Sequence, residues 1–223
     1  MKQRAPYSAV IFDMDGVLVD TEPMHLRALN QVLAESGCAL SEEENQQLLG
    51  TSFKATWDFV IKRFGLDAEP ERYAPAYDEA VVNILRQPLT PAVGSMNLLG
   101  QLRARNMPMA LASSAKRRWI EATLDSLGMK DFFPITVSGE DVTESKPAPD
   151  IFLLAARRLG VPAQTCLVIE DSPNGITAGR SAGMDVIAVR TPNTEGLSLE
   201  NATRIVDSLE QIDLTALGLD NYA

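Results

Sequence analysis

Short apolar runs alternate with longer amphipathic segments over most of this chain, and this pattern predicts an α/β fold. The runs are too short to cross a membrane and are rich in residues that favour buried strands. They fall at residues 9–12, 107–112, 134–137, 166–169 and 186–189. Because helical segments separate the later runs, we expect right-handed crossovers and a Rossmann-like parallel sheet that is covered on both faces.

Four segments in the second half of the chain space their apolar residues for helices. They span residues 93–105, 116–127, 150–159 and 173–182. A glycine suited to a left-handed helix stop follows three of them, at Gly128, Gly160 and Gly183. Beyond them, residues 204–206 are expected to form an edge strand, and Asp207 with Glu210 is expected to cap a final helix.

The stretch from residue 20 to residue 87 contains no convincing strand. Ser41 and Glu44 have the spacing of a capping box, which predicts a short helix to about residue 49. Pro75 is expected either to break the last helix of this stretch or to lie in its first turn. The other expected helices span residues 22–36, 53–64 and 69–86.

These patterns predict two domains. Residues 1–19 and 88–223 are expected to form the α/β core, and residues 20–87 an all-α domain inserted after the first strand. A chain of 223 residues, 45% of them hydrophobic, is long enough to bury a core in such an arrangement.

Charge and cysteine usage narrow the class of protein. A net charge of -10 argues against nucleic acid or an anionic membrane as partner, but does not exclude a small phosphorylated ligand. The apolar run near the N-terminus is too short for a signal sequence or a membrane span. Cys38 and Cys166 lie in unrelated contexts, so we expect no disulfide and a reducing, cytoplasmic location. A monomer is expected.

The first apolar run ends in two carboxylates, Asp13 and Asp15, followed by Gly16. Side chains two apart on a strand point the same way, so the two anions are expected to lie close together. Such a pair either takes up protons or holds a cation, and Mg²⁺ suits oxygen ligands. The alternative is a solvated Asp-Gly turn, and this run alone does not decide between them.

Further polar groups follow the other predicted strands. Because parallel sheets bind ligands outside the carboxyl ends of their strands, these groups are expected at one edge. Each also has a structural explanation: Ser113 or Ser114 could cap the next helix, and Lys146 could be a solvated loop lysine. Ser172 is expected to be an N-cap, with Pro173 at the first helical position. The groups that follow the strands are Ser113, Ser114, Glu170 and Asp171, and Lys146 lies in a loop that precedes a helix.

Four motifs together resemble those of the haloacid dehalogenase superfamily of phosphotransferases. They are the segments 12–17 (FDMDGV), 112–114 (ASS), 146–147 (KP) and 170–175 (EDSPNG). The helical insert is similar to the first type of cap in that superfamily. Within it, residues 20–25 (DTEPMH) and 146–150 (KPAPD) are typical of the β-phosphoglucomutase-like branch.

The resemblance implies a role for the carboxylates. Asp13 is similar to the nucleophile that becomes an aspartyl-phosphate, and Asp15 to the acid that protonates the leaving alkoxide and then activates water. Mg²⁺ would be held by the Asp13 carboxylate, the Asp15 main-chain carbonyl and Asp171. Glu170 would be either a further ligand or a partner of the ligands.

The resemblance also implies how the phosphate is held and covered. Ser113, the Ser114 amide and Lys146 would contact the oxygens of the transferring group. The helical insert would act as a lid hinged near residues 19–22 and 87–91.

In the insert, two regions match substrate-contacting positions of the branch. The spacing of His25, the only histidine, favours a packing residue, whereas the resemblance favours a hydrogen-bond partner for Asp15. The cap loop that contacts substrate corresponds to Gly50, Thr51, Ser52, Phe53 and Lys54. True β-phosphoglucomutases carry an arginine where this chain has Phe53, and an arginine suits a second phosphate. This difference favours hydrolysis over mutase activity.

The sequence therefore predicts a Mg²⁺-dependent phosphatase of small phosphorylated metabolites. The expected substrates are sugar or polyol phosphates. The alternative within the family is a β-phosphoglucomutase. A receiver-like signalling domain also gathers acids, a hydroxyl and a lysine at strand ends, but it has no helical insert after the first strand. A non-catalytic binding protein on the same scaffold would not need both Asp13 and Asp15.

Overall fold

The structure is a computed structural model, and it describes residues 7–48, 53–66 and 69–218. The chain divides into two compact units, which are described separately below. Unit 1 comprises Met1–Asp20 and Leu89–Ala223, and unit 2 comprises Thr21–Pro88. Across the described ranges, no helix combines the length and the apolar composition needed to span a bilayer.

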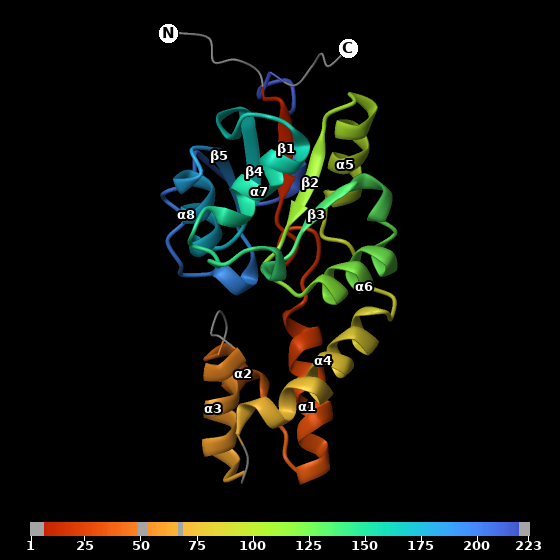
Figure 1. The fold of residues 1–223 in the computed structure, drawn as a ribbon, viewed down its shortest axis with the longest axis vertical. Coiled ribbons are helices and arrows are strands. Elements are labelled where there is room, and N and C mark those ends of the chain that lie inside the picture. Colours follow the sequence, from red (N-terminus) through yellow and green to blue (C-terminus); the bar gives the residue numbers. More distant parts are fainter. Residues whose placement is uncertain (1–6, 49–52, 67–68, 219–223) are drawn as a thin grey trace. The chain divides into compact units, whose positions relative to one another are not determined.

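A six-stranded parallel sheet forms the centre of unit 1 (Figure 1), which confirms the predicted α/β class. Its strand order is β3-β2-β1-β4-β5-β6, so the first strand lies in the interior between β2 and β4. The strands are β1 (Ala9–Phe12), β2 (Met109–Ala112), β3 (Ile135–Val137), β4 (Cys166–Glu170), β5 (Asp185–Val189) and β6 (Arg204–Val206).

Alternation along each inner strand divides the apolar side chains between two cores. In β1, Val10 and Phe12 pack into one core, whereas Ala9 and Ile11 pack into the other. All four residues are at most 1% exposed. Burying a large aliphatic or aromatic side chain contributes roughly 1.5–3 kcal/mol, so both faces of this strand stabilise the fold.

Helices cover both faces of the sheet. Helices α5 and α6 contribute to the core that contains Phe12, and α7 and α8 to the core that contains Ile11. The predicted stops Gly128 and Gly160 adopt left-handed conformations directly after α6 and α7. The four helices are α5 (Ser95–Ala104), α6 (Arg117–Leu127), α7 (Asp150–Leu159) and α8 (Pro173–Ser181).

The predicted final helix is wrong. Between residue 207 and residue 218, where the described part of the chain ends, the only helical element is the 3₁₀ turn η6 (Leu209–Gln211). Ser208 is its cap and accepts a hydrogen bond from the Glu210 amide at 3.2 Å. Leu209 and Ile212 are buried at a three-residue spacing, which suits a single tight turn over the core.

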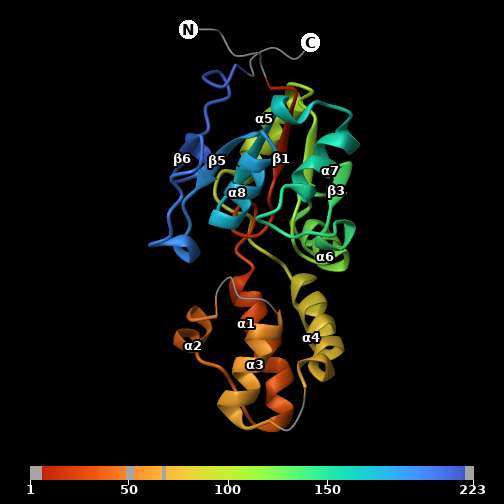
Figure 2. The ribbon, with the colours of Figure 1, turned by 60° about the vertical axis from the view of Figure 1, so that its left-hand side comes forward.

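Unit 2 is all-α in its described part, and Figure 2 shows its helices. The Ser41–Glu44 capping box is present, at 3.2 Å and 3.0 Å for its two hydrogen bonds. The helices are α1 (Glu22–Leu33) with the 3₁₀ turn η1 (Ala34–Ser36), α2 (Glu42–Gln46), α3 (Phe53–Phe64) and α4 (Pro70–Leu85).

The expectation for Pro75 is wrong, because α4 continues through it and begins instead with Pro70. A proline inside a helix removes one donor, here the partner of the Glu71 carbonyl. Both Glu71 and Pro75 are exposed, so water can satisfy that carbonyl.

Candidate active site

Asp13 follows the last residue of β1, and its amide donates to the Ile169 carbonyl of β4 at 2.9 Å. Its side chain is buried and lies 2.5 Å from the ammonium of Lys146. The same ammonium is 2.8 Å from Glu170 and 3.2 Å from the carbonyl of Ala112, at the end of β2. Lys146 thus joins three strand ends around one carboxylate.

Glu170, the last residue of β4, is hydrogen-bonded through both carboxylate oxygens. Oε1 accepts from Lys146, and Oε2 accepts from the amides of Asp171 and Ser172, both at 2.7 Å, and from the Ser172 hydroxyl at 3.0 Å. The predicted N-cap is confirmed, since Ser172 Oγ accepts from the Gly175 amide. A side chain on Gly175 would overlap Glu170, its Cβ falling 1.5 Å from Oε1. These contacts favour an orienting role for Glu170 over direct metal ligation.

Ser113 connects the β2 end to the second carboxylate. Its hydroxyl donates to Asp15 Oδ2 at 3.1 Å and accepts from the Ala115 amide at 3.1 Å. The capping alternative is wrong for both serines, because α6 begins at Arg117 with Lys116 as N-cap. Ser114 is exposed, and no described residue accepts a hydrogen bond from its amide. That amide can therefore donate to a ligand.

A tight turn brings Asp171 against the loop that carries Asp15. Gly16 has φ +81°, and its amide donates to the Val19 carbonyl at 2.8 Å. A Cβ on Gly16 would lie 2.0 Å from Asp171 Oδ2, so only glycine fits here. Thr191, just beyond β5, donates to Asp171 Oδ2 at 3.3 Å. Thr191 was not predicted, although the rule of looking at strand ends could have found it.

Negative charge exceeds positive charge in this cluster. Burial raises the pKa of Asp13 well above its usual range; Lys146 opposes this effect, and Glu170, Asp15 and Asp171 add to it. Burial and Glu170 raise the pKa of Asp171 to about 8. Burial alone would lower the pKa of Lys146, but Asp13 and Glu170 outweigh it and raise that pKa. The site therefore favours uptake of protons or of a cation.

The donor set fits a hard divalent cation such as Mg²⁺. Asp13 and Asp171 present buried carboxylate oxygens, and burial first, then the neighbouring carboxylates, raises the pKa of both, so a bound cation would stabilise their ionised forms. Within the described ranges, no three His, Cys, Asp or Glu side chains already converge as a complete ligand set. A main-chain oxygen, solvent and substrate would have to complete the coordination, as is usual for Mg²⁺.

The remaining predicted residues belong to unit 2. His25 lies on α1, where its Nδ1 is 2.9 Å from the hydroxyl of Tyr77, a partner that was not predicted. Its relation to Asp15 stays a prediction. Phe53, the first residue of α3, is 39% exposed and lies against Trp57 and Tyr77.

Lys54 forms an exposed ion pair with Asp58 at 2.6 Å. Gly50, Thr51 and Ser52 lie outside the described residues.

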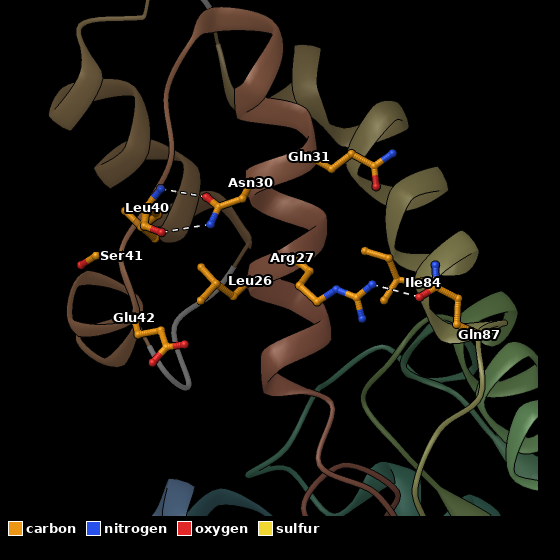
Figure 3. A pocket seen from close by; sticks show the side chains of 9 residues that line it. All are labelled: Leu26, Arg27, Asn30, Gln31, Leu40, Ser41, Glu42, Ile84 and Gln87. Atoms are coloured by element: carbon orange, nitrogen blue, oxygen red, sulfur yellow. Dashed lines mark hydrogen bonds between the residues drawn. The ribbon is translucent and has the colours of Figure 1, made fainter.

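Unit 2 also contains an open pocket of about 610 Å³ (Figure 3). Polar groups on its wall bind one another: Arg27 donates to Gln87 at 2.9 Å, and Asn30 exchanges two hydrogen bonds with the backbone of Leu40. None of the predicted site residues lines it. The pocket is a depression between α1, α4 and the segment before α2, not the site assembled in unit 1.

Replacing Lys146 by methionine is expected to destabilise unit 1 by about 3–5 kcal/mol, because it leaves buried carboxylates without their cation. Thermal unfolding measures the change. Lys130→Met is the matched control: Lys130 pairs with Asp125 at the surface, with 66% of its side chain exposed, and should cost less than about 1 kcal/mol. Equal melting temperatures for the two variants would contradict the buried ion-pair cluster.

Comparison with known proteins agrees with this geometry. The sequence pattern of the haloacid dehalogenase-like hydrolases matches residues 10–189. The chain is 35% identical to a probable pseudouridine-5'-phosphatase of Drosophila melanogaster, over 95% of this chain and 94% of the relative. It is also 35% identical to the fructose-1-phosphate phosphatase YqaB of Escherichia coli, over 82% and 97%. The β-phosphoglucomutase structure from Clostridium difficile is 28% identical and superposes with a TM-score of 0.76, covering 95% and 96% of the two chains.

Proposed function

Because the chain belongs to the haloacid dehalogenase-like hydrolases and is a phosphatase of that family, we propose that it hydrolyses the phosphate monoesters of sugars or polyols through an aspartyl-phosphate on Asp13. One observation carries the proposal. The buried Asp13 carboxylate lies at the end of an interior strand, 2.5 Å from Lys146, with Asp15 two residues further along the chain. This arrangement supplies a nucleophile, a cation and a second proton-transfer group.

The proposed reaction has two steps. Asp13 attacks phosphorus, and Asp15 donates a proton to the departing sugar oxygen, which is a poor leaving group near neutral pH. Asp15 then removes a proton from the water that hydrolyses the aspartyl-phosphate. The hydrogen bond from Ser113 holds the Asp15 carboxylate during both steps.

The transferring phosphoryl group needs donors and positive charge around it. Lys146 and the Ser114 amide are suited to contact its oxygens, and Glu170 keeps the ammonium of Lys146 in place. We propose that Asp13, the Asp15 carbonyl and Asp171 would hold Mg²⁺, which would add positive charge beside these oxygens.

The names of two relatives support a narrower substrate class. The E. coli relative is named for fructose 1-phosphate and the Drosophila relative for pseudouridine 5'-phosphate. In both compounds the phosphate is on a primary carbon of a sugar. We therefore infer that this chain acts on a phosphate carried by a primary carbon of a sugar or polyol.

A panel of phosphorylated metabolites tests this proposal. We expect Mg²⁺-dependent release of inorganic phosphate, fastest from sugar phosphates esterified at a primary carbon. Chelation with EDTA should abolish release, and added Mg²⁺ should restore it. Activity that survives chelation would contradict the metal assignment. A preference for phosphates on secondary or anomeric carbons would contradict the substrate class.

A second candidate is a β-phosphoglucomutase, which the structural similarity to the C. difficile enzyme favours. Two observations weigh against it. Phe53 stands where a true mutase carries an arginine, and the adjacent Lys54 is already paired with Asp58. A bisphosphate intermediate carries a second phosphate with nearly two negative charges, which an arginine can bind in bidentate fashion and a phenylalanine cannot.

We expect the wild-type protein to form no appreciable glucose 6-phosphate from β-glucose 1-phosphate, even when it is primed with the bisphosphate. Phe53→Arg should tighten binding of sugar bisphosphates by about tenfold, the lower end of the range for a charged hydrogen bond, and affect aryl phosphates little. A coupled glucose 6-phosphate assay measures isomer formation beside phosphate release. Phe53→Leu controls for loss of the ring. Rapid isomer formation by the wild type would make the mutase the correct function.

The proposed setting is a monomer in the cytoplasm. Cys38 and Cys166 are both free thiols, as a reducing compartment requires. Burial raises the pKa of the Cys166 thiol to about 11, which keeps it protonated and unreactive at neutral pH.

A further inference from the structure

A second charged cluster lies beside the serine loop (residues 113–115), and none of its members was singled out from the sequence. Asp141 ends the 3₁₀ turn η3 (Gly139–Asp141), which follows β3. Its Oδ2 accepts from the Ser138 amide at 2.8 Å and the Ser138 hydroxyl at 3.1 Å. Arg117 of α6 binds the same oxygen, and Arg158 of α7 lies 3.3 Å from Oδ1. Because α6 and α7 cover opposite faces of the sheet, Asp141 links both faces at the β3 edge.

The neighbours of Asp141 hold its carboxylate in the ionised form. Burial alone would raise the pKa of Asp141, but the hydrogen bonds from Ser138 and Arg158 and the charge of Arg117 lower it to about 2. Asp141 therefore stays ionised throughout the neutral range. Both arginines make further contacts with Thr136 of β3, one to its hydroxyl at 3.2 Å and one to its carbonyl at 2.9 Å.

The turn that contains Asp141 packs directly on the serine loop. The Gly139 amide donates to the Ala115 carbonyl at 3.1 Å, and Glu140 accepts from the amide of Arg117 at 2.9 Å. There is no room for a side chain on Gly139, because its Cβ would lie 2.4 Å from the Ser114 carbonyl oxygen. A displacement of this turn would therefore move the Ser114 backbone.

The same turn begins the segment that delivers Lys146. Only residues 142–145 separate Asp141 from Lys146, and they form neither helix nor strand. The ammonium at the end of this segment must still reach Asp13 at 2.5 Å and Glu170 at 2.8 Å. The position of Asp141, where the segment begins, therefore limits where the Lys146 ammonium can lie.

We propose that Asp141, held by Arg117 and Arg158, is a positioning residue that keeps the serine loop and the Lys146 segment at a fixed separation around Asp13. The proposal rests on the proposed function, in which the Ser114 amide and Lys146 contact the transferring phosphoryl group and Ser113 holds Asp15. It assigns to Asp141 no contact with substrate. A misplacement of about 1 Å in such groups can cost on the order of a hundredfold in rate.

Asp141→Asn tests the proposal, with Asp185→Asn as a matched control. Asp185 is a buried carboxylate that also binds an arginine, Arg180 at 3.2 Å, together with Tyr7 and Thr203. It lies at the start of β5, the opposite end of the sheet from the site. Each variant removes the negative charge of an aspartate that binds arginine, so both should unfold at a lower temperature than the wild type.

Kinetics below both unfolding temperatures separate the two roles. For Asp141→Asn we expect kcat to fall at least tenfold and inhibition by inorganic phosphate to weaken severalfold. Asp185→Asn should keep both values within twofold of the wild type. A kcat for Asp141→Asn within twofold of the wild type would overturn the proposal, and so would an equal loss in Asp185→Asn.

Hydrogen exchange followed by mass spectrometry gives a second measurement that does not depend on activity. In Asp141→Asn we expect faster exchange in peptides covering residues 113–117 and 142–147, with β1 unchanged. Unchanged exchange in both peptides would overturn the proposal. If Asp141→Asn does not fold, Arg158→Gln replaces it, because Arg158 is 38% exposed and its loss should destabilise the protein less. In Arg158→Gln, too, the peptides covering residues 113–117 and 142–147 must exchange faster than in the wild type. A wild type without phosphatase activity would refute the proposed function, while the exchange result would still decide the positioning role.

Discussion

Replacing Asp13 by asparagine is expected to abolish turnover of every phosphate monoester while the protein stays folded. An amide is a far weaker nucleophile than a carboxylate and a poorer ligand for Mg²⁺. Loss of a nucleophile typically costs on the order of 10⁴–10⁶-fold in rate. The substitution also removes one negative charge from a cluster in which a single ammonium faces four carboxyl groups. We therefore expect little loss of stability.

Phosphate release from the fastest substrate of the panel, together with thermal unfolding, measures both expectations. Asp131→Asn serves as a control, because Asp131 is an exposed residue of the turn after α6. Wild-type rates in a purified Asp13→Asn protein, with no wild-type contaminant detected by mass spectrometry, would refute the assignment of the nucleophile.

Much of unit 1 follows from local sequence. Helix α7 has the predicted limits, Asp150–Leu159, because a proline precedes it and a glycine follows it. The β1 residues are buried on both faces, and an unbroken apolar run is what such a strand needs. Once parallel strands are inferred, the rule that ligands bind at their carboxyl ends places Asp13, Ser113 and Asp171 together.

Other contacts depend on tertiary packing that no local pattern records. Lys146 lies in a segment without regular structure, so the sequence could place it at the same sheet edge as Asp13 but not show that its ammonium contacts Asp13 and Glu170. Arg117, Asp141 and Arg158 belong to α6, the turn after β3 and α7, and only the folded sheet brings them into contact. Pro75 shows the reverse case, because local sequence predicts a break and the helix continues. The helix tolerates the proline because the Glu71 carbonyl, which loses its hydrogen-bond donor, is open to water.

The two neighbouring aspartates have different partners, which bears on the roles proposed for them. Ser113 donates to Asp15, whereas Lys146 pairs with Asp13 and Glu170. The proposed nucleophile is thus held by a cation and the proposed acid-base group by a neutral hydroxyl. Lys146 opposes the rise that burial causes in the pKa of Asp13 and so favours its ionised form, whereas the Ser113 hydroxyl orients the Asp15 carboxylate. This difference fits the two roles proposed for these neighbouring aspartates.

Replacing Asp15 by asparagine is expected to slow sugar phosphate hydrolysis by about 10²–10⁴-fold, because the amide neither protonates the leaving oxygen nor activates water. An aryl phosphate, whose leaving group needs little protonation, should still phosphorylate Asp13. The aspartyl-phosphate should then accumulate, since its hydrolysis still needs the missing base. A burst of aryl alcohol, followed by slow turnover, would report this accumulation.

Rapid acid quenching and intact-protein mass spectrometry detect the trapped phosphoenzyme directly. Ser113→Ala is the matched control, because it removes the hydroxyl that binds Asp15 at 3.1 Å but leaves the carboxylate in place. That variant should slow both steps moderately and should trap little phosphoenzyme. The double variant Asp13→Asn/Asp15→Asn should show no burst, which ties the trapped group to Asp13. If Asp15→Asn accumulated no phosphoenzyme and still hydrolysed sugar phosphates rapidly, Asp15 would not be the acid and base, and Ser113 would be orienting a carboxylate with another role.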